Sequence, residues 1–219
     1  MRFTEELRSA SAEWDAVTCH RFTDDLAAGS IERDVLKRYL VQDHRFLDAF
    51  VVLLATAVAK VRTLDDRVPG CQFLALITGK ENTYFERSFE ALGISAEDRA
   101  QTPNRPCTEQ FIELMRGMSS EGTLGEILSV LVVCEWTYMS WGERVVEKTV
   151  RDDFTCYEWV DLHSGAYFQG VVEYLRSLLD GEGALMDDAQ REKCRAAFSQ
   201  TLRLEKAFFD DCYSDEQNV

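Results

Sequence analysis

The sequence predicts an all-α, single-domain helical bundle of about seven helices. The three prolines, Pro69, Pro103 and Pro106, leave long stretches without a helix breaker. Apolar residues recur at three-, four- and seven-residue intervals, as they do along one face of a helix. No stretch shows the alternation of Val, Ile and Thr that is typical of strands. Since a helical chain of 219 residues can bury one core, we expect residues 1–219 to form one domain.

The clearest helical segment covers residues 31–61. Its apolar face is marked by Val35, Tyr39, Phe46 and Phe50. Beyond Phe50 the segment is apolar on nearly all sides, which is typical of a central helix in a bundle. Similar periodicity marks six further segments, at 4–27, 70–92, 107–118, 123–149, 153–180 and 187–212. Ser30 and Asp153 are predicted N-caps, because a short oxygen-bearing side chain can accept from free backbone donors there.

The charge of the chain disfavours several kinds of partner. The chain has 24 Lys and Arg against 39 Asp and Glu, a formal charge of -15. This sign is opposite to the one that binds phosphate backbones or anionic lipid, so neither nucleic acid nor a membrane is an expected partner. No apolar run reaches the roughly 18–20 residues of a spanning helix. The first residues mix charges and show no apolar signal core, so we expect a cytoplasmic protein.

The seven cysteines form no CxxC pair and are odd in number, which predicts reduced and mostly buried thiols. Cys134 lies where a fully apolar stretch becomes mixed. Tyr138 follows one helical turn later and should share its face. Glu135 is rotated by about 100° and is expected to face another surface of the pocket or a neighbouring helix. From these residues alone, a buried structural thiol is the more common interpretation.

Two acids lie in apolar surroundings. Glu205 is surrounded in sequence by Leu202, Leu204, Phe208 and Phe209. A buried carboxyl there would have a raised pKa and could serve as acid and base, but an exposed position beside Lys206 fits the pattern equally well. Asp43 precedes Phe46 by three residues, and the pair could offer a polar anchor and a stacking face to a flat heteroaromatic ring. An exposed acid is the alternative for Asp43.

Metal and phosphate chemistry lack their usual motifs. The three histidines, His20, His44 and His163, suggest a metal-dependent oxidase as an alternative, but no Glu-x-x-His pair occurs in the chain. Gly-rich phosphate loops, GxSxG and HExxH are also missing. These observations lead to a helical domain with several candidate polar residues.

The order of six local motifs resembles the TenA (thiaminase II) family over essentially the whole chain. These motifs are HRFTDDLAAGSI, YLVQDHRFL, the stretch from Glu81 to Ser95, CEWTYMSWG, YEWVDLHSGAYF and LRLEKAFFDDCY. The resemblance implies a haem-oxygenase-like fold, a homotetramer, and no metal or organic cofactor. It also implies a small-molecule substrate, a 4-amino-2-methylpyrimidine derived from thiamine, whose hydrolysis releases hydroxymethyl pyrimidine for thiamine salvage.

The resemblance also assigns roles to four residues by position. Cys134 matches the nucleophile that adds to the pyrimidine ring, and Glu205 matches the carboxyl that moves protons to the leaving amine and from the attacking water. Asp43 matches the acid that holds the ring's amino group and a neighbouring ring nitrogen. Tyr138 matches a pocket tyrosine whose hydroxyl lies near the nucleophile.

Four positions depart from the family pattern. Phe46 stands where many relatives carry Tyr, and His163, a group able to titrate near neutrality, replaces a tyrosine four residues after Trp159. A third tyrosine is replaced near Cys107, unless Phe111 takes its place. Glu135 matches a glutamate found in relatives that lack the cysteine, so it is expected in the substrate pocket. The replaced tyrosines leave open a non-catalytic pyrimidine-binding protein.

Overall fold

The computed structural model describes residues 1–214. All regular secondary structure within them is helical, and they contain no strand. The helices are α1 (Phe3–Ser9), α2 (Trp14–Thr18), α3 (Arg21–Ala27), α4 (Arg33–Lys60), α5 (Leu64–Leu76), α6 (Asn82–Leu92), α7 (Ala96–Gln101), α8 (Pro106–Glu121), α9 (Leu124–Val145), α10 (Phe154–Leu162), α11 (Gly165–Gly183) and α12 (Asp188–Cys212). A π-helix, η1 (Ile77–Glu81), joins α5 to α6, and a 3₁₀ turn, η2 (Val146–Lys148), follows α9. The all-α prediction is confirmed.

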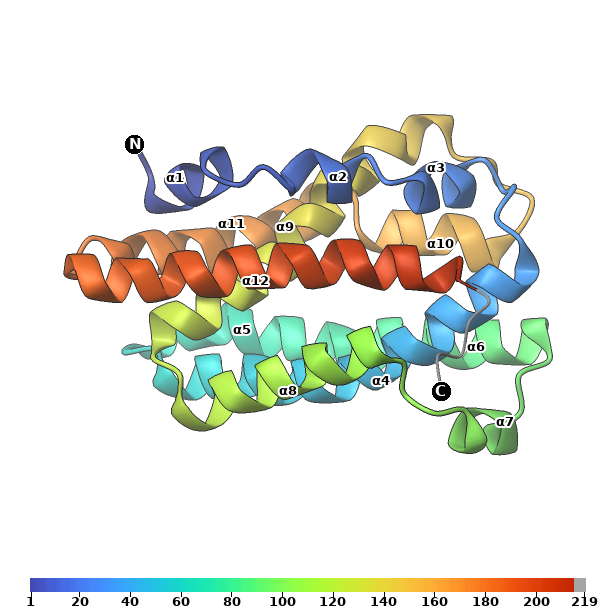
Figure 1. The fold of residues 1–219 in the computed structure, drawn as a ribbon, viewed down its shortest axis with the longest axis horizontal. Helices are drawn as coiled ribbons and strands as arrows, with labels where there is room; N and C mark the ends of the chain where they lie inside the picture. Colours follow the sequence, from blue (N-terminus) through green and yellow to red (C-terminus); the bar gives the residue numbers. More distant parts are fainter. Residues whose placement is uncertain (215–219) are drawn as a thin grey trace.

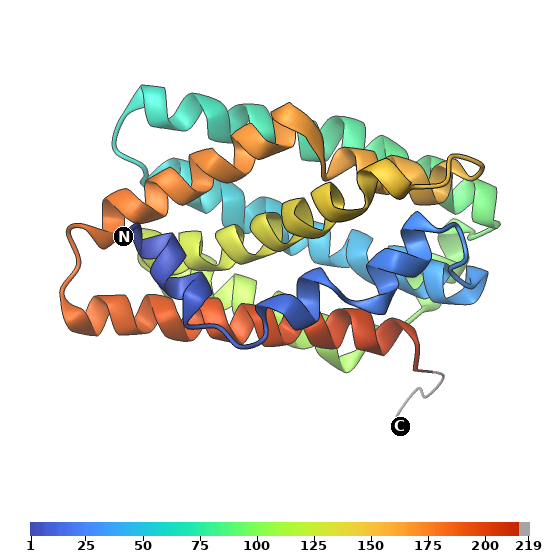
Figure 2. The ribbon, with the colours of Figure 1, turned by 90° about the horizontal axis from the view of Figure 1, so that it is seen from above.

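The long helices form a bundle around α9. Figure 1 shows α12 (red) running the length of the molecule, with α4, α5 and α8 on one side of it and the short helices α1 to α3 on the other. The view from above shows α9 lying between α11 and α12 (Figure 2). Helix α9 packs against both, and also against α4. It is therefore the element that holds the two sides of the bundle together.

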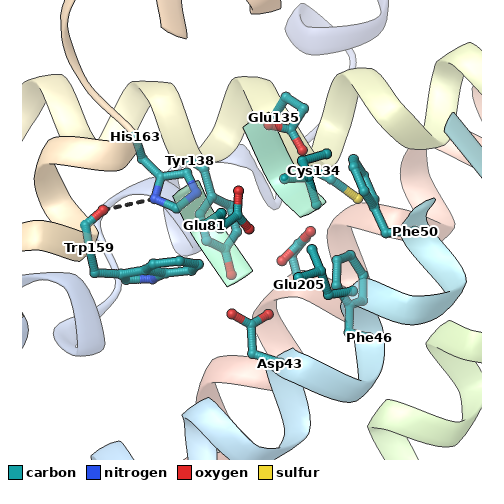
Figure 3. Close-up of a pocket in the computed structure, with 12 residues that line it drawn as sticks. Asp43, Phe46, Phe50, Glu81, Cys134, Glu135, Tyr138, Trp159, His163 and Glu205 are labelled. Carbon is teal, nitrogen blue, oxygen red and sulfur yellow. Dashed lines mark hydrogen bonds between the residues drawn. The ribbon is translucent and has the colours of Figure 1, made fainter. Parts of the chain in front are cut away.

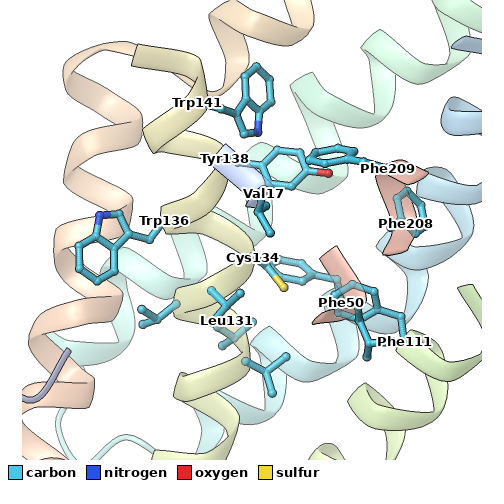
Figure 4. Close-up of a cluster of buried hydrophobic side chains, with 14 of the residues drawn as sticks. Val17, Phe50, Phe111, Leu131, Cys134, Trp136, Tyr138, Trp141, Phe208 and Phe209 are labelled. Atoms are coloured by element: carbon cyan, nitrogen blue, oxygen red, sulfur yellow. The ribbon is translucent and has the colours of Figure 1, made fainter. Parts of the chain in front are cut away.

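The sequence of α9 suits this central position. A capping box starts the helix: the Thr123 hydroxyl accepts from the Glu126 amide, and the Glu126 carboxylate accepts from the Thr123 amide. Side chains on all sides of the helix are buried, as expected of a helix surrounded by others. Figure 4 shows Cys134 on α9 within this apolar core, close to Leu131 and Phe50.

Two predicted helices are divided in the structure. The segment 4–27 forms three short helices. The third begins after His20, whose ring nitrogen accepts from the Phe22 amide and so caps that helix. The segment 153–180 breaks at His163, and Gly165 takes a φ of +80° that permits the change of direction. Gly142 of α9 lies against this corner, since a Cβ there would be 2.3 Å from the His163 carbonyl oxygen.

Two further boundaries differ from the prediction. The sequence predicts a helix over 70–92, but α5 begins at Leu64, where the Thr63 hydroxyl accepts from the Asp66 amide. Pro69 lies inside α5, where it removes a single backbone donor. The short helix α7 was missed because none of its residues is buried, so it has no apolar periodicity. More helices therefore occur than the seven expected.

One of the two predicted caps is confirmed. The Asp153 carboxylate accepts from the Thr155 amide at 2.9 Å at the start of α10. Ser30 is not the cap of α4: Glu32 occupies that position without a side-chain hydrogen bond, and the Ser30 hydroxyl donates to the Asp25 carbonyl oxygen. Backbone donors of Ser30 and Ile31 also bond to Asp25, which closes the α3–α4 turn.

Candidate active site

A buried pocket lies where α4, α9, α10, α12 and η1 meet (Figure 3). Its cavity volume is about 30 Å³, enough for about one or two water molecules, so the side chains around it pack closely. The residues that line it are Asp43, Phe46, Leu47, Phe50, Ile77, Glu81, Cys134, Glu135, Tyr138, Trp159, His163 and Glu205. All seven predicted site residues are among them, so residues 162 positions apart in sequence come together in one cavity.

Helix α4 contributes an acid and an aromatic ring. Asp43 is 6% exposed, and burial raises its pKa to about 7, although the nearby Tyr39 hydroxyl opposes the rise. The Phe46 ring packs edge-on against Phe111 with centroids 4.8 Å apart. Phe111 is buried behind Phe46 and does not line the pocket. Cys107 does not line it either, and its thiol donates to the Leu204 carbonyl oxygen. Asp43 thus offers a polar group to the pocket, and Phe46 offers an apolar ring about one helical turn later.

Helix α9 contributes Cys134 and Tyr138, which share a face as predicted. Cys134 is 3% exposed, and its pKa is raised well above its usual range, first by burial and then by Glu205 and Glu135. The thiol is therefore protonated at neutral pH. Because the thiolate is the reactive form, this cysteine needs a neighbouring base before it can attack.

Helix α12 supplies that base at Glu205, which is 2% exposed and so not on the wet face of its helix. Its Oε1 atom has no hydrogen-bond partner within residues 1–214. Burial raises the pKa of Glu205 to about 8, with the nearby Cys134 thiol opposing the rise. A carboxyl that titrates near neutrality can both donate and accept a proton during a reaction.

A chain of hydrogen bonds fixes Tyr138. The Trp159 Nε1–H donates to the Tyr39 hydroxyl at 3.0 Å, and that hydroxyl lies 2.9 Å from the Tyr138 hydroxyl. Each of these three side chains is buried. The Tyr138 hydroxyl is therefore held at the pocket wall by partners from α4 and α10.

His163 lines the pocket, but its charge state differs from the one that the sequence predicted. Its Nδ1 is 2.8 Å from the Trp159 carbonyl oxygen, which can only accept, so Nδ1 carries the proton and Nε2 is a free acceptor. Burial lowers the pKa of His163 to about 4. The ring is therefore neutral at physiological pH and does not titrate near neutrality as the sequence suggested.

Sequence reasoning missed Glu81 as a pocket residue. Phe73, Ile77, Glu81, Phe85 and Phe89 recur every four residues, a spacing at which an ordinary α-helix would drift away from one face. The π-helix widens the turn and keeps Ile77 and Glu81 facing the core. A single acid in the middle of an apolar stripe was the signal available in the sequence.

Four carboxyls therefore face one pocket that no Lys or Arg lines. They are Asp43, Glu81, Glu135 and Glu205. Glu135 lines the same pocket as its neighbour Cys134, which is one of the two positions expected for it from the sequence. Burial is the largest cause of the raised pKa of each carboxyl.

Residues 1–214 contain no metal-binding cluster and no membrane-spanning helix. No group of three or more His, Cys, Asp or Glu side chains there is arranged to hold a metal ion. None of the helices in that range is both long and apolar enough to cross a bilayer.

The sequence of this chain matches one protein-family model and is similar to several known proteins. The model of the TENA/THI-4/PQQC family matches residues 7–215. The chain is similar to an aminopyrimidine aminohydrolase from Halalkalibacterium halodurans, with 24% identity over 98% of this chain and 97% of that protein. A protein of the same name from Bacillus subtilis is 25% identical over 99% of this chain and 92% of that protein.

The fold has a solved counterpart. The structure of a TenA homologue from Pyrococcus furiosus superposes with a TM-score of 0.86 at 22% identity, covering 96% of this chain and all of the other. At this level of identity the likeness concerns the fold. A domain from Shewanella denitrificans that is described as having a heme oxygenase-like fold superposes with a TM-score of 0.72 at 15% identity, covering 97% of this chain and 92% of the other, so the haem-oxygenase-like fold expected from the sequence is confirmed.

Proposed function

The chain belongs to the TENA/THI-4/PQQC family, and from this membership and the pocket we propose that it is an aminopyrimidine hydrolase of the thiaminase II type. The proposed substrate is 4-amino-5-aminomethyl-2-methylpyrimidine or a related thiamine breakdown product, and the proposed product is hydroxymethyl pyrimidine for thiamine salvage. The observation that supports this best is that Cys134, Glu205 and Asp43 line one cavity.

Asp43 is proposed to hold the aminopyrimidine edge. A protonated carboxyl can donate to a ring nitrogen while its other oxygen accepts from the exocyclic amino group. With a pKa of about 7, Asp43 can be protonated in the empty pocket at neutral pH. Phe46 offers a flat apolar surface to the ring, and the neutral His163 offers an acceptor at Nε2.

Cys134 and Glu205 are proposed to carry out the chemistry. Ionised Glu205 takes the thiol proton as the Cys134 sulfur bonds to the ring, and Asp43 protonates the ring nitrogen that receives the electron pair. That pair then expels the amine from the methylene carbon, the amine takes the proton from Glu205, and the ring nitrogen returns its proton to Asp43.

Water completes the exchange. Its oxygen bonds to the methylene carbon while Glu205 takes its proton and Asp43 again protonates the ring nitrogen. The sulfur then leaves the ring with the proton from Glu205, and Asp43 recovers its own. The net reaction converts an aminomethyl pyrimidine and water into a hydroxymethyl pyrimidine and ammonia, and both carboxyls end as they began. Tyr138 is proposed to steady the nucleophile through its hydroxyl.

The proposal extends to location and assembly. Five of the seven cysteines are buried and all are unpaired, which suits the reducing cytoplasm. The family resemblance supports a homotetramer. Light scattering on the purified protein would test the assembly, and a monomeric mass would contradict it.

An assay of turnover tests the proposed activity. We expect the wild-type protein to release equal amounts of ammonia and hydroxymethyl pyrimidine from 4-amino-5-aminomethyl-2-methylpyrimidine. Tight binding of that compound without turnover would favour a non-catalytic pyrimidine-binding protein. Stoichiometric iron in protein purified with iron present would favour the oxidase alternative.

A further inference from the structure

Two carboxyls in the pocket have no part in the proposed reaction. Glu81 on η1 and Glu135 on α9 are each 9% exposed. Neither side chain has a hydrogen-bond or ion-pair partner within residues 1–214, and the pKa of Glu81 is raised by burial and by Asp43 alone. Buried carboxyls without partners are costly, so their presence in a cavity points to a ligand that supplies the missing donors.

The surroundings specify the charge of that ligand. The pKa of Glu135 is raised most by burial, then by Glu81, and only then by Glu205 and Asp43, and both glutamates line the same cavity. Because no Lys or Arg lines the pocket, no cationic side chain there compensates their charge when they ionise. An ionised pair in this setting is stabilised by a cation that carries several N–H donors.

Glu135 lies apart from Asp43, the proposed anchor of the ring, whereas Glu81 is close enough to Asp43 for that acid to raise its pKa. In Figure 3, Glu205 lies between Asp43 on one side and Cys134 with Glu135 on the other. In a pyrimidine whose amino edge meets Asp43, the 5-substituent is on the next ring carbon and would project beside that edge, toward the other acids that line the cavity. The π-helix places Glu81 on the same cavity, where an ordinary α-helical turn would rotate it away.

We propose that Glu81 and Glu135 form a cation subsite that binds the protonated amine of the substrate's leaving group and selects cationic over neutral 5-substituents. This inference rests on the proposed function. An ammonium group has three donors for the two carboxylates and already holds the proton that Glu205 would otherwise deliver. With this cationic substrate Glu205 keeps the thiol proton until the sulfur leaves the ring. The amine leaves as ammonia and, in place of Glu205, takes the proton of the attacking water, so that RCH₂NH₃⁺ and H₂O give RCH₂OH and NH₄⁺.

A pair of ligands that differ in one group tests the subsite. Dissociation constants are measured by calorimetry for the aminomethyl pyrimidine and for its neutral hydroxymethyl counterpart. The Cys134→Ala protein is used so that neither ligand is consumed. Adding Glu81→Gln or Glu135→Gln should weaken binding of the aminomethyl compound about tenfold or more, as expected for a hydrogen bond to a charged group. Binding of the hydroxymethyl compound should change by less than about twofold.

Glu90→Gln is the matched control. Glu90 is an exposed acid on α6, the helix that continues from η1, and its replacement should leave both dissociation constants unchanged. Equal losses for the two ligands in Glu81→Gln and Glu135→Gln, or no loss in either, would overturn the subsite.

Proton release gives a second measurement that needs no glutamate variant. Carboxyls that are protonated in the empty pocket should lose protons when a cation binds, so calorimetry in buffers of different ionisation enthalpy should show more release for the aminomethyl than for the hydroxymethyl ligand. Equal release would contradict the subsite. Failure to bind either ligand would refute the subsite together with the proposed function, whereas cation-selective binding by a wild-type protein without turnover would refute only the reaction.

Discussion

Replacing Glu205 with Gln should stabilise the protein, and more so at pH 7 than at pH 5. The carboxyl is fully buried and its pKa is about 8, against 4.5 for an unhindered glutamate. The folded state therefore binds this proton more tightly than the unfolded state does. The free energy of unfolding falls as the pH rises from about 4.5 to about 8, and the neutral amide of Gln removes this dependence.

The size of the effect follows from the two pKa values. Each pH unit between them costs about 1.4 kcal/mol, and the unfolded carboxyl is already mostly ionised at pH 5. From pH 5 to pH 7 the destabilisation by Glu205 grows by about 2.5 kcal/mol. For a domain of this size, a change of 1 kcal/mol moves Tm by about 2–4 °C, so the gain in Tm should be about 5–10 °C larger at pH 7.

Thermal unfolding followed by circular dichroism at the two pH values measures this difference. Glu90→Gln replaces an exposed acid and should shift Tm by the same small amount at both. If Glu205→Gln changed Tm equally at pH 5 and pH 7, the carboxyl would have an ordinary pKa and could not serve as the proposed acid and base.

Three further outcomes are expected. Asp43→Asn should lower kcat/KM for the aminopyrimidine about tenfold or more, since the amide cannot exchange a proton with a ring nitrogen; an unchanged kcat/KM in the ammonia assay would contradict this role. His163 should stay neutral down to about pH 5 in an NMR titration, because burial lowers its pKa to about 4, and a midpoint near neutrality would contradict that burial. Gly142→Ala should lower the free energy of unfolding in urea by about 1–3 kcal/mol, since its Cβ would lie 2.3 Å from the His163 carbonyl oxygen. Gly117→Ala is its control on α8, where a Cβ meets no atom within 4 Å, and a similar loss there would refute the steric explanation.

Much of the fold could be predicted because apolar periodicity reports burial directly. The predicted segment 31–61 covers α4, which begins two residues later and ends one residue earlier. The predicted segment 187–212 differs from α12 by one residue at its start. Periodicity alone does not show where a helix stops when the apolar pattern continues across the break. The divisions at His20 and at His163 depend on a cap and on a close helix–helix approach that only the packed structure contains.

The candidate site was less accessible from sequence. Residue spacing left Cys134 and Glu205 indistinguishable from a core thiol and a surface acid, and the family resemblance separated them. Neither approach identified Glu81, because its orientation depends on a π-helical turn. The charge of His163 could not be predicted from the sequence either, since its pKa is set by how completely the surrounding helices exclude water.

The initial rate of ammonia release by Cys134→Ala tests the central claim most directly. With 4-amino-5-aminomethyl-2-methylpyrimidine as substrate, removing the nucleophile should lower the rate about a thousandfold or more. Cys194→Ala, which removes another buried thiol from α12 away from the pocket, should keep the wild-type rate. A Cys134→Ala protein that turned over within about tenfold of the wild type would contradict covalent catalysis by Cys134.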